Sequence, residues 1–395
     1  MAKRAGIVAG IVVLVASSMC WASPSGATID TEYGWDYRSM SISGSGLIPI
    51  RGQFGGDGAT DVLWYAPGTA ADTVWYGRTG LRGSTAFRRE RVNITGRYTP
   101  ITGDFVGDEA TDIFWYAPGA TADFIWAGKL GGTGFTSYPA PVGGTFKPYA
   151  LHDFHDNQKD DILWYDATVG KDYLWHFAED GSGAKTSKQF VLNRTFRITI
   201  GDFDGNRSSD VFLYAPSSYG DLVWYFDDDG NYQVSPMSLN EKAFIPTTVY
   251  QEVEDDVLLW QSGTPRERYF EGTPNTPGSL WEKSIRSMDW EGVPYSLALG
   301  ALIVVPDGPE ILLRSNGVDD LEWYELAPPS RDQSAGIVPV TGDFDGDGYL
   351  DVVWYGSGSR GDQLWYTQAS SSARTQREVR RPAADVGTVE AIPTA

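Results

Sequence analysis

Cysteine, histidine and basic residues are scarce in this sequence. It has a single cysteine, Cys20, and 3 histidines among 395 residues. We therefore expect neither an intrachain disulfide nor a zinc site built from Cys and His. Its 31 Lys and Arg stand against 52 Asp and Glu, which gives a formal net charge of −21. Binding to the phosphates of nucleic acids needs an excess of Lys and Arg over Asp and Glu, so no nucleic-acid partner is expected.

Long hydrophobic runs and common catalytic motifs are also absent. Beyond the N-terminal segment, no apolar run approaches the roughly 20 residues that a membrane-spanning helix requires. The patterns H-E-x-x-H, G-x-S-x-G and the P-loop do not occur, and we expect no enzyme activity. What the chain does have is 41% hydrophobic residues, 13% aromatic residues and 15 Trp. This composition predicts a large core, stabilised by burial or bound ions.

The N-terminus has the pattern of an export signal. Lys3 and Arg4 precede an apolar stretch over 5–16, and small residues follow it. We predict that residues 1–22 are a cleaved signal peptide and that the mature chain is secreted. A lipid-modified Cys20 is the less favoured alternative, because the three residues before it include no Leu.

A repeat fills most of the remaining sequence. Seven copies of an acid followed by an apolar run are spaced 41 to 54 residues apart. They begin at Asp61, Asp112, Asp161, Asp210, Asp256, Glu310 and Asp351. In six copies a second signature of the form Asp-x-x-Trp follows; these begin at Asp72, Asp123, Asp172, Asp221, Asp320 and Asp362.

Each copy divides into short β-branched and aromatic runs separated by Gly, Pro, Asp and Ser, with no helical periodicity. In copy two we predict strands over 98–105, 112–116, 124–128 and 135–138. Four antiparallel strands repeated seven times predict an all-β fold, a seven-bladed β-propeller. The tryptophans of the two signatures are expected to fill the space between blades.

The predicted propeller spans residues 46–382. The segment 23–45 and the tail 383–395 each resemble a strand that could close the ring. Residues 37–54 resemble 87–105, which makes the N-terminal segment one candidate for an outer strand of the last blade, and residues 386–393 of the tail resemble an inner strand. The sequence leaves the choice of terminus open.

Acidic loops precede several of the repeated strands. In copy seven, oxygen donors lie at alternate positions along a segment that contains two glycines. Donors with this spacing can converge on one Ca²⁺ ion. The candidate ligands there are Asp343, Asp345, Asp347, the carbonyl of Tyr349, and Asp351. Copy four offers Asp202, Asp204, Asn206, the carbonyl of Ser208, and Asp210. Weaker candidates are Asp104, Asp108 and Asp112 in copy two, and Asp153, Asn157 and Asp161 in copy three. The alternative is a set of Asx turns that order the hairpins without metal.

The unit GDFDGDGYLDVVWYGSGS and its weaker copies resemble the FG-GAP or VCBS repeat, found in the seven-bladed propeller of integrin α chains and in secreted bacterial proteins. The resemblance covers roughly residues 46–380 and departs from the pattern in copies five and six. It implies a propeller with Ca²⁺ in the loops that join the first and second strands. It also implies an adhesive or ligand-binding role on the opposite face.

Variable loops between the second and third strands are the predicted working surface, because loops carry function while repeated strands carry packing. They contain Lys171, Tyr219, Arg266, Arg314, Asn316 and Arg360. We expect a monomeric, non-catalytic module that binds an extracellular protein or glycan. A carbohydrate-binding propeller is the first alternative, and a polysaccharide lyase or glycosidase is the second.

Arginines also cluster in the predicted outer strands of neighbouring blades. They are Arg88, Arg89 and Arg91 in copy one and Arg374, Arg377, Arg380 and Arg381 in copy seven. They predict one basic flank on an acidic protein. The alternative is local pairing with acids such as Glu90 and Glu378.

Overall fold

The fold is described from a computed structural model. The model describes residues 33–68, 71–119, 122–152, 159–168, 170–178, 185–192, 194–216, 220–227, 230–237, 239, 244–249, 254–260, 268–273, 280–283, 302–303, 311–312, 314–315, 321–322, 337–348, 351–356 and 361–369. The predicted signal peptide, Cys20, the arginines from Arg374 onward and the tail 383–395 lie outside these residues.

Six four-stranded antiparallel sheets form the described fold, and we name each after the sequence copy that forms it. Blade one is β2 (Ile48–Gly52), β3 (Asp61–Tyr65), β4 (Asp72–Gly77) and β5 (Phe87–Val92); blade two is β6 (Thr99–Gly103), β7 (Asp112–Tyr116), β8 (Phe124–Ala127) and β9 (Thr136–Pro139). Blade three is β10 (Lys147–Leu151), β11 (Asp161–Tyr165), β12 (Asp172–Phe177) and β13 (Lys185–Phe190); blade four is β14 (Arg197–Gly201), β15 (Asp210–Tyr214), β16 (Asp221–Phe226) and β17 (Tyr232–Met237). Blade five is β18 (Ile245–Val249), β19 (Asp256–Trp260), β20 (Arg268–Glu271) and β21 (Trp281–Lys283); blade seven is β26 (Ile337–Gly342), β27 (Asp351–Gly356), β28 (Asp362–Ala369) and β1 (Tyr33–Met40).

Little else is regular in the described residues. Copy six contributes two short pairs, β22 (Leu302–Ile303) with β23 (Ile311–Leu312) and β24 (Arg314–Ser315) with β25 (Leu321–Glu322). The one helical element among the described residues is a 3₁₀ turn, η1 (Gly83–Thr85). Within the described part of the chain, no helix has the length and apolar character needed to span a membrane.

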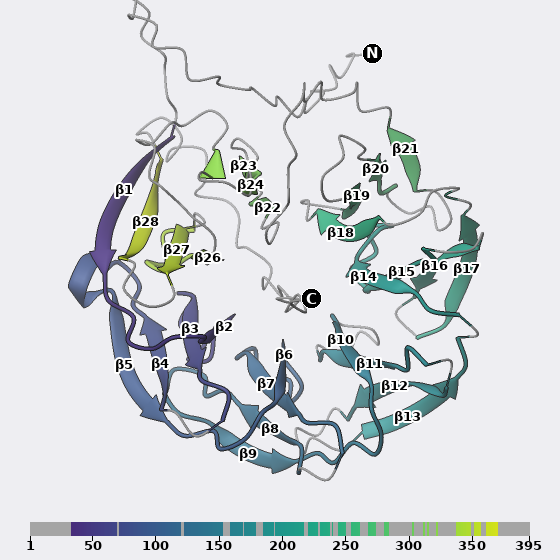
Figure 1. The fold of residues 1–395 in the computed structure, drawn as a ribbon, viewed down its shortest axis with the longest axis horizontal. Coiled ribbons are helices and arrows are strands. Elements are labelled where there is room, and N and C mark those ends of the chain that lie inside the picture. The colour runs from purple at the N-terminus through teal and green to yellow at the C-terminus, as the bar shows by residue number, and fades with distance from the viewer. Residues whose placement is uncertain are drawn as a thin grey trace, which may run out of the picture.

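The sheets stand side by side around a common centre, as Figure 1 shows. Their first strands, β26, β2, β6, β10, β14 and β18, lie innermost, and successive first strands contact one another. The predicted all-β class and the repeated four-stranded antiparallel sheets are confirmed. Much of copy six lies outside the described residues, so the count of seven blades stays a prediction.

The N-terminal segment forms the outer strand of blade seven. β1 pairs antiparallel with β28 over its whole length, from Tyr33 opposite Ala369 to Met40 opposite Asp362. Just beyond β1, the backbone N–H of Ile42 donates to Oδ2 of Asp362 at 2.7 Å. The last sheet therefore contains strands from both ends of the described chain.

In the described blades, the acid that begins the repeated second strand is a buried hydrogen-bond acceptor. Asp61, for example, is 1% exposed and accepts the backbone N–H of Gly55 at 3.0 Å and of Gly77 at 2.7 Å. It thus ties the preceding loop to the end of the third strand. Asp112 and Asp210 likewise accept one N–H from the preceding loop and one from the end of the third strand. A buried carboxylate is tolerated there because both of its oxygens are bonded.

The aspartate of the second signature does the same at the other end of the blade. Asp72 accepts the N–H of Ala66 at 2.7 Å and of Ile94 at 2.8 Å. It joins the second-to-third-strand loop to the chain that leaves the outer strand. Asp123, Asp172 and Asp221 make the corresponding pair of bonds in blades two to four.

The tyrosine that ends the repeated second strand holds the link to the next blade. The Tyr65 hydroxyl donates to the carbonyl of Gly96 and accepts the N–H of Tyr98, both at 2.9 Å. Tyr116 and Tyr165 contact the following links in the same way. In the blades that carry it, this tyrosine therefore fixes how the blade continues into its neighbour.

Tryptophans of the two signatures pack edge to face in blades one, two, three and seven and fill the blade boundaries. Trp64 and Trp75 lie 5.6 Å apart between ring centroids, and Trp64 also meets Tyr355 of blade seven at 5.2 Å. Trp115 reaches back to Tyr65 of blade one at 5.0 Å. The predicted packing role of these rings is confirmed for the described blades.

Neighbouring blades are also joined by a repeated backbone latch. In each pair, one partner directly precedes the acid that begins a second strand, and the other is the first residue of the first-to-second-strand loop in the preceding blade. The residue before the acid donates its backbone N–H to the backbone carbonyl of the loop residue. Its side-chain oxygen accepts the backbone N–H of the loop residue. The pairs are Asp343 with Thr60, Gln53 with Thr111, Asp104 with Asp160, His152 with Ser209, and Asp202 with Asp255. The Asp343–Thr60 pair joins blade seven to blade one.

Candidate metal centres

The loops that join first and second strands keep one backbone conformation in four described blades. The third and fifth residues after the first loop residue have positive φ in each case. They are Gly56 and Gly58, Gly107 and Glu109, Gly205 and Arg207, and Gly346 and Gly348. The loop shape is therefore kept in blade one, which has lost most of the acids.

The first aspartate of the loop supports that shape. In Asp104, Asp202 and Asp343, one carboxylate oxygen accepts the backbone N–H of the fourth following residue and the other accepts that of the fifth. Such Asx-type bonds order a turn without a metal. Each oxygen keeps lone pairs for a further contact.

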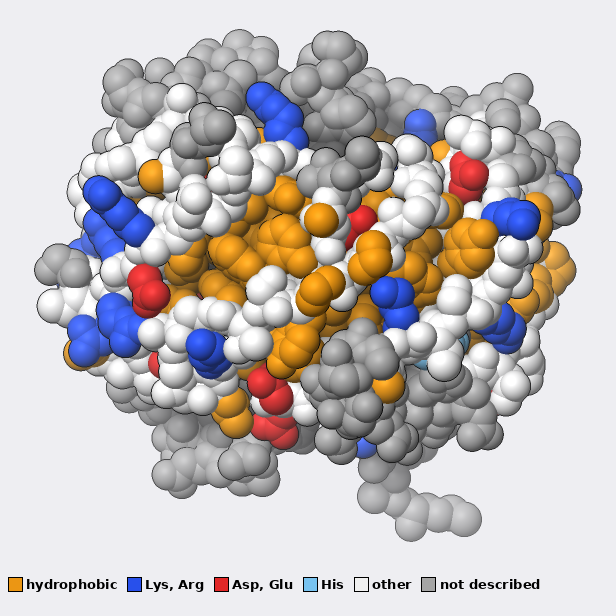
Figure 2. Space-filling model, turned by 90° about the horizontal axis from the view of Figure 1, so that it is seen from below, with side chains coloured by type: hydrophobic (Ala, Val, Ile, Leu, Met, Phe, Trp, Pro, Cys, Tyr) orange, Lys and Arg blue, Asp and Glu red, His pale blue; other side chains and the backbone are white. Residues whose placement is uncertain are grey.

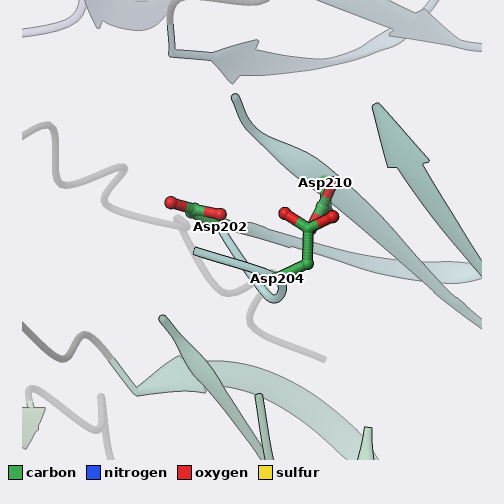
Figure 3. Close-up of side chains that lie close together, drawn as sticks. All are labelled: Asp202, Asp204 and Asp210. Carbon is green, nitrogen blue, oxygen red and sulfur yellow. The ribbon is translucent and has the colours of Figure 1, made fainter. Parts of the chain in front are cut away.

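The blade-four loop brings three carboxylates together. One oxygen each of Asp202, Asp204 and Asp210 lie within 4.8 Å of one another. Figure 3 shows the Asp204 and Asp210 carboxylates facing each other beside Asp202. Asp204 is 2% exposed and Asp210 is fully buried. Oxygen donors in such a group suit a hard cation such as Ca²⁺.

The two other predicted residues of this loop are placed around the carboxylates. The Asn206 backbone N–H donates to Asp202 at 3.0 Å and to Asp204 at 3.2 Å. Its side-chain oxygen accepts the N–H of Ser208 at 2.7 Å, and its side-chain amide donates to the carbonyl of Phe226 at 2.6 Å. The Asn206 side chain thus braces the loop from within.

The blade-seven loop repeats the trio with Asp343, Asp345 and Asp351. Asp347, predicted as a fourth carboxylate ligand, forms an ion pair with Arg82 of blade one, whose Nη2 lies 3.0 Å from its Oδ2. Nε of Arg82 also contacts Oδ2 of Asp345. A cation from the neighbouring blade therefore lies against this acidic loop. Tyr349 lies outside the described residues.

Burial makes these acids hard to ionise in the absence of a counter-ion. Desolvation raises the pKa of Asp343 to about 6, and the nearby charges of Asp347 and Asp345 add to the shift. The pKa of Asp210 is raised well above its usual value by burial and by Asp204. A bound cation would reverse both effects by favouring the ionised carboxylates.

The weaker candidates do not form a comparable group among the described residues. Asp104, Asp108 and Asp112 share the blade-two loop, but their oxygens do not gather as in blades four and seven. Lys159 of blade three lies beside this loop instead, and its ammonium donates to the carbonyls of Val106 and Ala178. This lysine is 3% exposed.

In copy three, Asp153 and Asn157 lie outside the described residues. Asp161 is buried and contacts His176, with 2.8 Å between Oδ2 and Nδ1. His152 contacts Asp160 at 2.7 Å. The described histidines therefore pair with aspartates.

The predicted ligand-binding loops are described only in part. Lys171 is exposed directly before β12, and Arg314 begins the short strand β24. Tyr219, Arg266, Asn316 and Arg360 lie outside the described residues. Residues that the sequence did not single out are Arg82 and Lys159, because only the fold brings them to the loops of neighbouring blades.

Solved structures resemble this fold at low sequence identity. The chain is similar to BBS1N, crystallised in complex with ARL6DN, with a TM-score of 0.50, 10% identity and coverage of 82% of this chain and 93% of that chain. It is also similar to the exotype rhamnogalacturonan lyase YesX, with a TM-score of 0.40, 10% identity and coverage of 84% and 72%, which is too weak to support an argument. No protein-family model and no curated protein matches the chain. The chain is thus an all-β protein of propeller-like architecture.

Proposed function

We propose that the protein is a secreted, calcium-binding, seven-bladed β-propeller that acts as a non-catalytic ligand-binding or adhesion module. The observation that carries the calcium part is the carboxylate trio, which recurs at the same loop positions in blades four and seven. The seven copies of the repeat support the blade count. The resemblance to FG-GAP repeats supports both parts.

Calcium would have a structural role in this proposal. Ca²⁺ takes six to eight oxygen ligands, so each trio would be completed by loop carbonyls and water. The first aspartate of each trio also holds the latch to the next blade, as Asp202 does with Asp255 and Asp343 with Thr60. An ion in the loop would therefore stabilise a blade boundary as well as a turn.

Calcium titration of the metal-free chain tests this role. We expect two binding events by calorimetry, of which Asp204→Ala removes one and Asp345→Ala the other. Each site should raise the free energy of unfolding by about 2.7 kcal/mol at 100 times Kd. Asp57→Ala, in the loop of blade one, is the matched control and should keep both events. The absence of both heat and a melting shift, in a chain shown to start metal-free, would reject the proposal.

The ligand-binding part rests on how the repeated residues are used. The aspartates, tryptophans and tyrosines of the described blades are engaged in bonds and packing that build the fold. We therefore assign ligand binding to the variable second-to-third-strand loops, which carry Lys171, Tyr219, Arg266, Arg314, Asn316 and Arg360, with an extracellular protein or glycan as the ligand. Incubation with a panel of polysaccharides tests the competing enzyme hypothesis, since release of new chain ends would contradict a non-catalytic role.

A further inference from the structure

The outer strands of blades one to three form a basic rim on an acidic protein. We define the rim surface as Arg88, Arg89 and Arg91 of β5, Lys185 and Lys188 of β13, and the blade-two aromatics Trp126, Phe135 and Tyr138. The strands β5, β9 and β13 together carry five Lys and Arg and one acid, Glu90. The whole chain carries 31 basic and 52 acidic residues, so the sign of the charge is locally reversed.

These cations are oriented by aromatic rings. The Arg89 guanidinium lies 3.9 Å from the ring centroid of Trp75, and the Lys185 ammonium 3.7 Å from that of Trp175. Arg88 lies over Tyr76 at 5.3 Å. Cation–π contacts of this kind hold a charged group in place without neutralising it.

Most of the rim cations make no ion pair within the described part of the chain. The one ion pair of the rim cations with an acid among the described residues is Arg88 with Glu90 at 3.4 Å, between two exposed side chains. An exposed pair of this kind contributes little binding energy, so it gives way readily to another anion. Arg89, Arg91 and Lys188 are exposed. The rim therefore offers positive charge to a ligand.

Blade two lies between these cations and contributes partly exposed aromatic rings. Its outer strand β9 is only four residues long and carries no charge. Trp126 and Phe135 stack at 5.0 Å, on the side of blade two that packs with Tyr76 of blade one. Tyr138 lies on the other side, with Trp175 of blade three. Figure 2 looks onto this rim and shows hydrophobic side chains across its middle, with Lys and Arg side chains to either side.

We propose that the rim surface binds a linear acidic polysaccharide that carries carboxylates at intervals. The cations of blades one and three would bind its carboxylates, while the rings of blade two contact the apolar faces of its sugars. Double-stranded DNA carries a charge about every 1.7 Å of its axis and would place phosphates over the uncharged blade-two stretch. A polymer with carboxylates at intervals matches the two separated groups of rim cations better than double-stranded DNA does. This surface is separate from the second-to-third-strand loops and from the calcium loops.

Affinity for hyaluronan, which has one carboxylate per disaccharide, tests the proposal. We expect the full chain to bind hyaluronan in low salt, to bind more weakly as salt rises, and not to bind dextran, a neutral polymer. The double variant Arg88→Gln/Lys185→Gln should weaken binding on the order of tenfold, as expected for the loss of one exposed and one half-buried charge contact. Tyr138→Ser should weaken it with the salt dependence unchanged.

Two controls keep the test decisive. Arg78→Gln removes an exposed charge elsewhere and should leave hyaluronan affinity unchanged, and every variant must melt as the unmodified chain does. Hyaluronan binding that is absent in low salt, or that survives in the double variant, overturns the proposal. Tighter binding to single-stranded DNA or to phosphatidylserine vesicles than to hyaluronan also overturns it.

Discussion

Two loop residues adopt a backbone conformation that suits glycine, and neither is glycine. Arg207 has φ 78° and Glu109 has φ 65°, whereas the equivalent residue of blade seven is Gly348. A left-handed conformation costs an L-residue roughly 1–2 kcal/mol. The loops of blades two and four therefore fold at an energetic disadvantage that the loop of blade seven avoids.

Replacing Arg207 with glycine should stabilise the protein. Arg207→Gly removes this strain and adds the entropy cost of a glycine, which leaves a gain of about 0.5–1 kcal/mol in the free energy of unfolding. Chemical denaturation in the presence of a chelator measures it. Lys171→Gly, at an exposed position without positive φ, should destabilise the chain instead. A loss of stability in Arg207→Gly would contradict the assignment of strain.

Arg82 is expected to compete with calcium in blade seven. Its contacts with Asp345 and Asp347 neutralise part of the loop, and its guanidinium also lies 4.9 Å over the Tyr366 ring. Arg82→Met should lower the melting temperature in chelator, because these contacts are lost. In calorimetry it should strengthen the Asp345-dependent calcium event several-fold and leave the Asp204-dependent event unchanged. Weaker calcium binding in blade seven would show that Arg82 supports the ion rather than competing with it.

Arg82 also marks a limit of what sequence can predict about the sites. The spacing within each loop indicated which acids could meet, and the carboxylate trios of blades four and seven contain only residues singled out in this way. Neither Arg82 nor Lys159 belongs to the loop that it contacts. Their positions depend on how adjacent blades are arranged in space. The residue spacing within one loop does not determine that arrangement.

At the scale of strands, the repeat predicted the bounds of an element closely where the side chains on both faces of the strand have defined packing partners. The second strand of blade two was expected over 112–116 and is β7 (Asp112–Tyr116). The fourth was expected over 135–138 and is β9 (Thr136–Pro139). β9 is exposed and polar, so its ends are set by pairing with β8 rather than by a buried pattern.

Removing the aspartate of the second signature should lower the free energy of unfolding more than removing most other residues of a blade. Asp72 is fully buried and accepts two backbone N–H groups. Asp72→Ala leaves both donors unsatisfied and should cost about 2–6 kcal/mol of the free energy of unfolding. Asp57→Ala, an exposed aspartate that accepts one N–H at 3.1 Å, should cost less than about 1 kcal/mol. Equal losses of the free energy of unfolding in the two variants would show that the buried hydrogen bonds of Asp72 stabilise the fold no more than the exposed one of Asp57.

For the whole molecule, β1 is the element on which the last sheet depends. A chain that begins at residue 41 lacks β1 and leaves β28 as an open edge. We expect this chain to melt at a lower temperature than one beginning at residue 23 and to aggregate through the exposed edge. Thermal melting and light scattering of the two chains measure these effects. Unchanged melting and no aggregation would mean that β1 is dispensable for closure.

The pairing of β1 with β28 also sets an order of events for folding. Ile42 and Asp362 are 320 residues apart in sequence, yet they bond directly. During synthesis the partner of β1 is the last described strand to appear, so the middle blades can assemble while β1 waits unpaired. Closure by such a distant contact is slow, and until it happens both ends of the unfinished ring expose strand edges. The pairing of β1 with β28 is therefore also the step that covers these edges and protects the protein from self-association.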